Sequence, residues 1–220
     1  MTTPVLSAIL ALTLLTEAPP IHAQTAPIRQ RLATATSWFY QLQNVDLAAL
    51  QKSTYDVIVL DLENDQRKVW QPRDIEALRT SGGRKRIVLA YISVGEAEKY
   101  RSYWRPEWFR KRPPWIGREN RSWKGNFSVM YWRDEWKRVL FRFGGMLDKA
   151  IGAGFDGVYL DRLDAYMDWG PTGRGKRHRT ASAKAMVTLV QDIAIHTRKT
   201  RSVPNFLIIG QNAPLLCEYP

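Results

Sequence analysis

The sequence has little from which to build a disulfide framework or a metal centre. Its 220 residues include one cysteine, Cys217, and three histidines. A single cysteine cannot form an intrachain disulfide, and we interpret its thiol as inert. So few cysteines and histidines give neither a metal-binding cluster nor a Ser-His-Asp arrangement. We therefore expect no metal site, and a fold that depends on its apolar core.

The sequence also lacks an apolar run of about 20 residues, the length that a transmembrane helix needs. The short run from Val5 to Leu15 precedes a small-residue cleavage site at Ala23. We interpret residues 1–23 as a secretory signal peptide; the alternatives are a membrane-anchoring helix or a buried helix. The sequence thus predicts a secreted or periplasmic protein without stable membrane insertion, with one domain over residues 24–220.

A glycine-rich dinucleotide-binding fingerprint is absent, which weakens the case for a doubly wound sheet. Continuous apolar runs, typical of strands buried on both faces of a parallel sheet, alternate with helical patterns. This alternation predicts an α/β fold, and we favour a TIM-type (β/α) barrel. The expected strands cover residues 37–42, 55–61, 86–93, 155–161 and 206–210, and the expected helices follow Pro72 or cover residues 136–151 and 181–196.

Positive charge is in excess, with a formal net charge of +12. Basic side chains cluster over residues 110–112 and 174–179. Such clusters attract phosphates or anionic polysaccharides, although a solvated basic surface is the simpler interpretation. Because an exported protein rarely meets nucleic acid, we expect no nucleic-acid partner.

Aromatic residues concentrate in residues 100–136, which hold six of the nine tryptophans and lack regular periodicity. A long loop of this kind is often functional. Flat rings could stack on the apolar faces of sugars, or they could form a satellite core under the loop. We expect both, with a few rings exposed.

Acidic and amide side chains recur where the expected strands end. The carboxyl ends of parallel strands meet at one edge of a sheet, so these side chains should share a cleft. Two carboxylates facing one cavity are what glycosidic bond cleavage needs. Asp161 is the leading catalytic candidate, although it could instead cap a helix or pair with Arg162. Glu96 and Glu98 are the other catalytic candidates.

Several stretches of the chain are similar to one known family. They are residues 88–101, Tyr103-Trp104, residues 126–132, residues 154–161 and Gln211-Asn212. Together they resemble the endo-α-1,4-polygalactosaminidases, a glycoside hydrolase group with bacterial extracellular members. The resemblance implies a TIM-type barrel that hydrolyses α-1,4-linked galactosamine-rich polymers without a cofactor. It also implies that Asp161 holds the nucleophile position.

The resemblance places the second acid of the family, a glutamate, on a strand later than any in residues 1–220. A complete barrel has eight strands and about 250 residues, whereas five strands are expected here. We therefore expect a partial (β/α)8 barrel without its C-terminal strands, and low or no hydrolysis by this length of chain.

The leading hypothesis is an exported glycoside hydrolase that acts on a galactosamine-rich or related polysaccharide. The alternatives are a non-catalytic cell-surface glycan-binding protein and a polyanion-binding surface protein. Among the residues expected to bind substrate, Asp61 could instead mark a helix start. The full set is Tyr40, Asp61, Tyr91, Ser93, Arg101, Trp104, Tyr131, Trp132, Tyr159, Asp164, Tyr166, Gln211 and Asn212.

Overall fold

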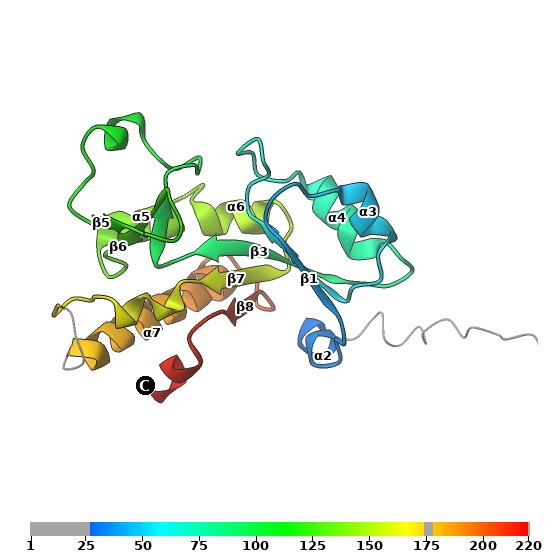
Figure 1. Ribbon diagram of the computed structural model, residues 1–220. Helices are drawn as coiled ribbons and strands as arrows, with labels where there is room; N and C mark the ends of the chain where they lie inside the picture. Colours follow the sequence, from blue (N-terminus) through cyan, green and yellow to red (C-terminus); the bar gives the residue numbers. More distant parts are fainter. Residues whose placement is uncertain (1–26, 174–177, 220) are drawn as a thin grey trace, which may run out of the picture.

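A parallel sheet of five strands forms the centre of the protein (Figure 1). The computed structural model describes residues 27–173 and 178–219, so the expected signal peptide over residues 1–23 lies outside the described residues. The strands lie in the order β1-β2-β3-β7-β8, and each neighbouring pair is parallel. Their bounds are Trp38–Gln41 for β1, Val57–Asp61 for β2, Ile87–Ser93 for β3, Gly157–Asp161 for β7 and Leu207–Gly210 for β8.

The central strands are apolar because both of their faces are covered. Every residue of β2 and β3 is buried. On one face, Ile58 and Val88 belong to the main apolar cluster. On the opposite face, which we call the inner face, Val59 and Leu89 belong to a smaller cluster. Burial of both faces explains the continuous apolar runs of these strands, and their parallel pairing confirms the expected parallel sheet.

Helices cover the two faces unequally. Apolar side chains of α3, α4, α6 and α7 enter the main cluster, whereas α2 packs on the inner face through Ile28 and Leu32. In Figure 1, α2 accordingly lies on the opposite side of the sheet from α3 and α4. The helix bounds are Ile28–Ala33 for α2, Leu47–Lys52 for α3, Pro72–Thr80 for α4, Asp134–Phe141 for α5, Met146–Gly152 for α6 and Arg179–Ile195 for α7. Shorter helical turns are η1 (Pro106–Phe109), η2 (Leu163–Met167), η4 (His196–Thr200) and η5 (Pro214–Glu218).

The single helix expected over residues 136–151 is two helices, α5 and α6. The break falls at Gly144, which has a φ of 70°, and Gly145. A Cβ atom at Gly145 would lie 2.8 Å from the carbonyl oxygens of Leu140 and Arg142. The apolar spacing was therefore correct for both helices, but the glycine pair ends the first one.

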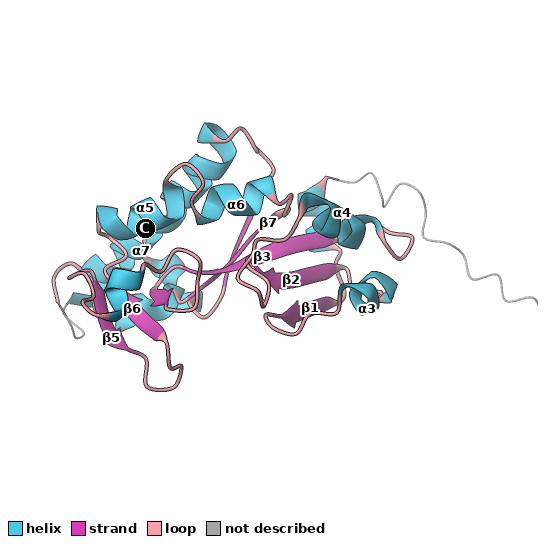
Figure 2. Cartoon of the chain, turned by 90° about the horizontal axis from the view of Figure 1, so that it is seen from above, coloured by secondary structure: helices cyan, strands magenta, loops and turns pink. Residues whose placement is uncertain are grey.

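The aromatic segment is more regular than expected, because it contains two strands of a second sheet. This antiparallel sheet has the order β4-β6-β5, with bounds Glu96–Glu98, Asn126–Val129 and Ile116–Glu119. Figure 2 shows β5 and β6 well away from β1, β2 and β3, which lie side by side. Trp104 and Trp115 are buried in the main cluster, whereas Trp123 is 69% exposed. The segment thus supplies both a satellite core and an exposed ring.

Strand register brings the expected site residues into rows on the inner face. Asp61 is the direct partner of Tyr91, and Tyr91 is the partner of Tyr159. Ser93 and Asp161 form the next row toward the carboxyl ends of the strands. The α/β fold with a parallel sheet is confirmed. Within residues 27–173 and 178–219 the sheet is open, with β1 and β8 at its edges and no closed barrel.

Candidate active site

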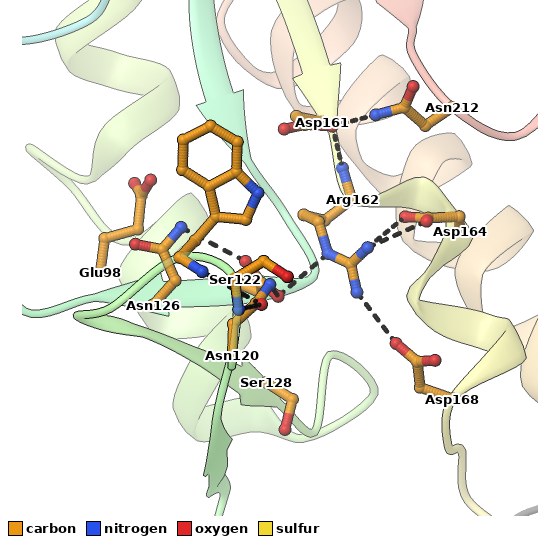
Figure 3. Close-up of polar contacts among 12 residues, drawn as sticks. Glu98, Asn120, Ser122, Asn126, Ser128, Asp161, Arg162, Asp164, Asp168 and Asn212 are labelled. Atoms are coloured by element: carbon orange, nitrogen blue, oxygen red, sulfur yellow. Dashed lines mark hydrogen bonds and ion pairs between the residues drawn. The ribbon is translucent and has the colours of Figure 1, made fainter.

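Asp161 stands at the end of β7 and receives three hydrogen bonds. The hydroxyl of Tyr91 donates to Oδ2 at 2.6 Å. The backbone N–H of Arg162 donates to Oδ1 at 2.7 Å, and Nδ2 of Asn212 donates to the same oxygen at 2.9 Å. Figure 3 shows the last two contacts. Because the three donors come from different segments, they fix the orientation of this carboxyl group at the carboxyl edge of the sheet.

The hydroxyl of Tyr91 keeps its proton and so remains a hydrogen-bond donor. Burial, together with the charges of Glu98 and Asp161, holds the pKa of Tyr91 well above its usual range. Tyr40 and Tyr159 lie beside it, with ring centroids 5.9 Å apart, and burial also raises the pKa of both. The inner face next to Asp161 is therefore a wall of protonated phenols.

Arg101 joins two buried carboxylates on the other side of the phenol wall. Its Nε donates to Glu98 at 2.5 Å, and its guanidinium also contacts Asp61. Tyr100 adds a 2.6 Å hydrogen bond to Glu98. Burial raises the pKa of Asp61 to about 6, although the charge of Arg101 acts in the opposite direction. Arg101, Asp61 and Glu98 form a buried ion network, and two of them, Asp61 and Arg101, also line a cavity.

That cavity has a volume of about 240 Å³ and opens at the carboxyl ends of β1 and β2. Its lining is mainly polar and carries more acidic than basic side chains, including Asp61, Glu63, Asp65, Tyr100, Arg67 and Arg101. A second cavity, of about 590 Å³ and mostly apolar, lies beside Asn212 between η5 and α7. Space for a ligand therefore exists on both sides of the row that holds Asp161.

Glu96 is held by side chains from three segments. Nε of Arg162 lies 3.1 Å from its Oε1, and Nδ2 of Asn120 donates to the same oxygen at 2.8 Å. Nδ2 of Asn126 donates to the other oxygen at 3.3 Å. These contacts tie β4 to the β5–β6 hairpin and to the turn after β7. Both oxygens of Glu96 are occupied in this arrangement.

The structure brings most of the expected site residues together. Tyr40, Asp61, Tyr91, Tyr159, Asp161, Glu98 and Arg101 form one continuous region, and Asn212 and Asp164 adjoin it. Ser93 and Gln211 lie at the ends of β3 and β8. The Oγ atom of Ser93 and the Oε1 atom of Gln211 are buried without a hydrogen-bond partner. Both atoms are thus available to a ligand that reaches the inner face.

Four residues expected to bind substrate are engaged in packing. Trp104 contacts Phe127, with ring centroids 5.3 Å apart. The buried hydroxyl of Tyr131 donates to the carbonyl of Ser182 at 2.8 Å. Trp132 packs against Trp169, and Tyr166 against Tyr219. The structure does not bring these rings to Asp161.

Sequence reasoning missed Arg162, Asn120 and Tyr100 as parts of the site. Arg162 directly follows Asp161, and its spacing to Asp164 and Asp168 was the only sequence signal of an ion-pair hub. Asn120 lies in a segment without periodicity, and its contact with Glu96 joins residues 24 positions apart. Contacts of that kind become visible only when the hairpin is folded.

Residues 27–173 and 178–219 contain neither a candidate metal site nor a candidate membrane span. Among these residues, no group of three or more His, Cys, Asp and Glu side chains is placed to hold a metal ion. None of the helices described there has the length and apolar composition to cross a bilayer.

Relatives of known sequence cover most of this chain. It is 40% identical over 185 residues to an uncharacterized protein of Methanocaldococcus jannaschii, matching 83% of this chain and 50% of that protein. It is 34% identical over 209 residues to an uncharacterized protein of Deinococcus radiodurans, matching 92% of this chain and 62% of that protein. The chain thus spans about half to three fifths of the length of these relatives.

Solved structures of similar fold include a glycoside hydrolase domain and a protein bound to galactosamine. The glycoside hydrolase domain of PelA from Pseudomonas aeruginosa aligns with a TM-score of 0.58 and 17% identity, over 85% of this chain and 63% of that domain. Aspergillus fumigatus Ega3, solved in complex with galactosamine, aligns with a TM-score of 0.50 and 18% identity, over 72% of this chain and 57% of that one. At these identities the likeness shows a shared fold.

A family model decides the classification. The model of glycoside hydrolase family GH114 matches residues 18–218, which is nearly the whole chain. The motifs around β3, β7 and β8 that suggested a polygalactosaminidase lie inside the matched range. The chain therefore belongs to glycoside hydrolase family GH114.

Proposed function

We propose that this chain is the catalytic region of an exported glycoside hydrolase that cleaves a galactosamine-rich or related polysaccharide. In this proposal Asp161 is the nucleophile or the charge-stabilising carboxylate. The observation that carries it is the set of three donors on Asp161, from Tyr91, Arg162 and Asn212. Glycoside cleavage passes through an oxocarbenium-like transition state, which a fixed and oriented anion stabilises.

An amino sugar suits the charge at this site. The chain carries a net charge of +12, so a cationic polymer is repelled at long range. Salt screens that repulsion beyond about 8 Å, however, and the local field decides binding at shorter range. Asp61 and Glu63 line the 240 Å³ cavity, and Asp161 stands beyond the phenol wall. Galactosamine is also the ligand of the structurally similar Ega3.

Glu98 and Glu96 are the other proposed site acids. Each lies against an arginine, Arg101 for Glu98 and Arg162 for Glu96. For either group to protonate a leaving oxygen, its ion pair must first open, which opposes proton donation. We therefore keep the expectation that residues 1–220 alone hydrolyse polysaccharide slowly.

The same ion pairs favour a second candidate, a glycan-binding protein without catalysis. In this alternative, the exposed ring of Trp123 and the polar cavity beside Asp61 hold the polymer, and Asp161 is one of its hydrogen-bond acceptors. The two candidates share a ligand and differ in whether any bond is broken.

A panel of defined oligomers tests the substrate. The chain is incubated for long times with α-1,4-linked galactosamine oligomers, with their N-acetylated forms and with anionic galacturonan oligomers. Product masses report cleavage, and calorimetry reports affinity at two salt concentrations. We expect shortened galactosamine oligomers. Binding without shortened products would support the second candidate, and affinity for galacturonan alone that collapses with salt would support the polyanion-binding alternative.

Export is tested separately. Residues 1–23 have the pattern of a secretory signal peptide, so protein expressed with its native leader should be recovered from the periplasm or the medium and begin at Gln24. Recovery of the uncleaved chain from the cytoplasm would contradict this part of the proposal.

A further inference from the structure

Arg162 has an unusual backbone conformation beside Asp161. Its φ of 62° and ψ of 30° lie in the left-handed region, which residues other than glycine rarely occupy. This turn directs the N–H of Arg162 back onto Oδ1 of Asp161, at 2.7 Å. Residues held in this region depend on surrounding contacts that fix the conformation.

The side chain of Arg162 supplies such contacts. Its Nη1 lies 2.9 Å from Asp164 and its Nη2 lies 2.9 Å from Asp168 (Figure 3). Its Nε lies 3.1 Å from Glu96. The guanidinium is planar and rigid, so three carboxylates around it fix its orientation as well as its position. The side chain is 21% exposed, which limits screening by solvent.

The turn is also packed tightly against the end of β3. The N–H of Val94 donates to the carbonyl of Asp161 at 3.0 Å. A Cβ atom at Gly95 would lie 2.9 Å from Cβ of Arg162 and would collide with its carbonyl oxygen. Glycine at position 95 therefore permits the close approach that brings Glu96 within reach of the guanidinium.

The groups that face Asp161 come from every neighbouring element. Tyr91 on β3 and Asn212 after β8 donate to it, and Tyr40 on β1 and Tyr159 on β7 stand close enough for their pKa values to respond to its charge. Asp164 on η2 is the nearest carboxylate whose pKa responds to Asp161, and Arg162 pairs with it. The more distant Asp61 and Glu98 share Arg101.

We propose that Arg162 is the positioning residue for Asp161: its guanidinium, clamped by Glu96, Asp164 and Asp168, holds the left-handed turn that presents the N–H to the Asp161 carboxylate. The same guanidinium compensates the negative charges of the three acids that surround it. A catalytic role for this arrangement rests on the proposed function. The geometry around Asp161 and the titration of its carboxyl group can be measured whether or not that proposal holds.

Two variants separate the roles of the backbone and the side chain. Arg162→Gly accepts the left-handed conformation without strain and removes the clamp. Arg162→Lys keeps the positive charge but cannot reach three carboxylates with one ammonium group. Ser202→Gly is the control, because Ser202 is an exposed residue with a φ of 56° that makes none of these contacts.

The first measurement is the titration of the Asp161 carboxyl carbon by ¹³C NMR, assigned with Asp161→Asn. We expect the midpoint to rise in Arg162→Gly and to stay unchanged in Ser202→Gly. An unchanged midpoint in folded Arg162→Gly would overturn the proposal. This experiment needs no substrate, so its result stands whether or not galactosamine oligomers are cleaved.

The second measurement is hydrogen exchange of the residue-162 amide. In Arg162→Lys the hydrogen bond to Asp161 should weaken, and exchange should become about tenfold faster while the surrounding sheet keeps its protection. Exchange at the wild-type rate would overturn the proposal even if Arg162→Gly fails to fold. Where hydrolysis is measurable, kcat should fall in both variants with little change in KM, and the acid limb of the pH profile should move up in Arg162→Gly alone.

Discussion

The hydroxyl of Tyr91 lies 2.6 Å from Oδ2 of Asp161, so that two neighbouring strands of the parallel sheet are joined at the point where the proposed chemistry occurs. Tyr91 is buried in the middle of the inner face, and Asp161 is partly open at its edge. The sheet therefore fixes the carboxylate from one side while leaving the other side open to substrate.

Removing this hydroxyl should weaken the function of Asp161 and leave the fold intact. In Tyr91→Phe, a charge-assisted hydrogen bond is lost, which corresponds to about a tenfold lower rate of oligomer cleavage. Tyr55→Phe is the control, because Tyr55 packs against Phe39 away from the site. Single-turnover rates with the galactosamine oligomers measure the effect, and equal rates for the two variants would argue against a role for Tyr91.

Asp61 should make stability fall as the pH rises. Its pKa is raised to about 6 in the folded protein, whereas an unfolded aspartate titrates near 3.9. Between these values the folded state binds the proton more tightly, so raising the pH favours unfolding. Relative to Asp61→Asn, the wild-type free energy of unfolding should fall by about 2–3 kcal/mol between pH 4 and pH 6.5. Urea unfolding measures this difference; a constant difference would show that Asp61 is ionised throughout.

Arg101 should be far more important for stability than a surface arginine. Arg101→Met leaves the carboxylates of Asp61 and Glu98 buried without their cation. This should lower the free energy of unfolding by about 3–5 kcal/mol. The matched control is Arg105→Met, because Arg105 is 60% exposed and lies 3.9 Å from Glu107. Arg105→Met should lower the free energy of unfolding by less than about 1 kcal/mol. Similar unfolding free energies for both variants would mean that the buried network contributes little.

Trp123 should bind sugar without supporting the fold. Its indole is 69% exposed in the β5–β6 turn, and the same turn contacts Lys99, the residue after Glu98, through the carbonyl of Gly125. Trp123→Ala should therefore weaken oligomer binding about tenfold, as expected for the loss of one stacked ring, and leave the melting temperature unchanged. Phe143→Ala removes a ring that is 90% exposed elsewhere on the surface. It should change neither the affinity for the oligomer nor the melting temperature. Calorimetry that finds equal affinities for both variants would remove Trp123 from the site.

Much of the fold could be predicted from the sequence, because buried parallel strands carry continuous apolar runs. The five strands of the sheet and the position of Asp161 at the end of β7 follow from that pattern. The antiparallel sheet could not be predicted in the same way, since β4, β5 and β6 have only three or four residues each. Strands that short carry no readable alternation, and their pairing depends on the hairpin as a whole.

The sequence predicted which acids lie at strand ends, but it did not predict which side chains pair with them. A carboxylate after an apolar strand has a defined position, whereas a long arginine such as Arg162 or Arg101 can reach in several directions. Some of its partners are far away in sequence: Asp61 is 40 residues from Arg101, and Glu96 is 66 residues from Arg162. Only the folded arrangement decides which acids are paired and which one is presented to substrate.

The most direct test compares the wild-type chain with Asp161→Asn on α-1,4-linked galactosamine oligomers. Asp192→Asn is the control, because Asp192 pairs with Lys137 on the surface of α7. We predict that Asp161→Asn loses measurable hydrolysis, at least about a thousandfold, while its affinity for the oligomer stays within about threefold. Hydrolysis by Asp161→Asn at the wild-type rate would contradict the assignment of Asp161 as the reacting carboxylate.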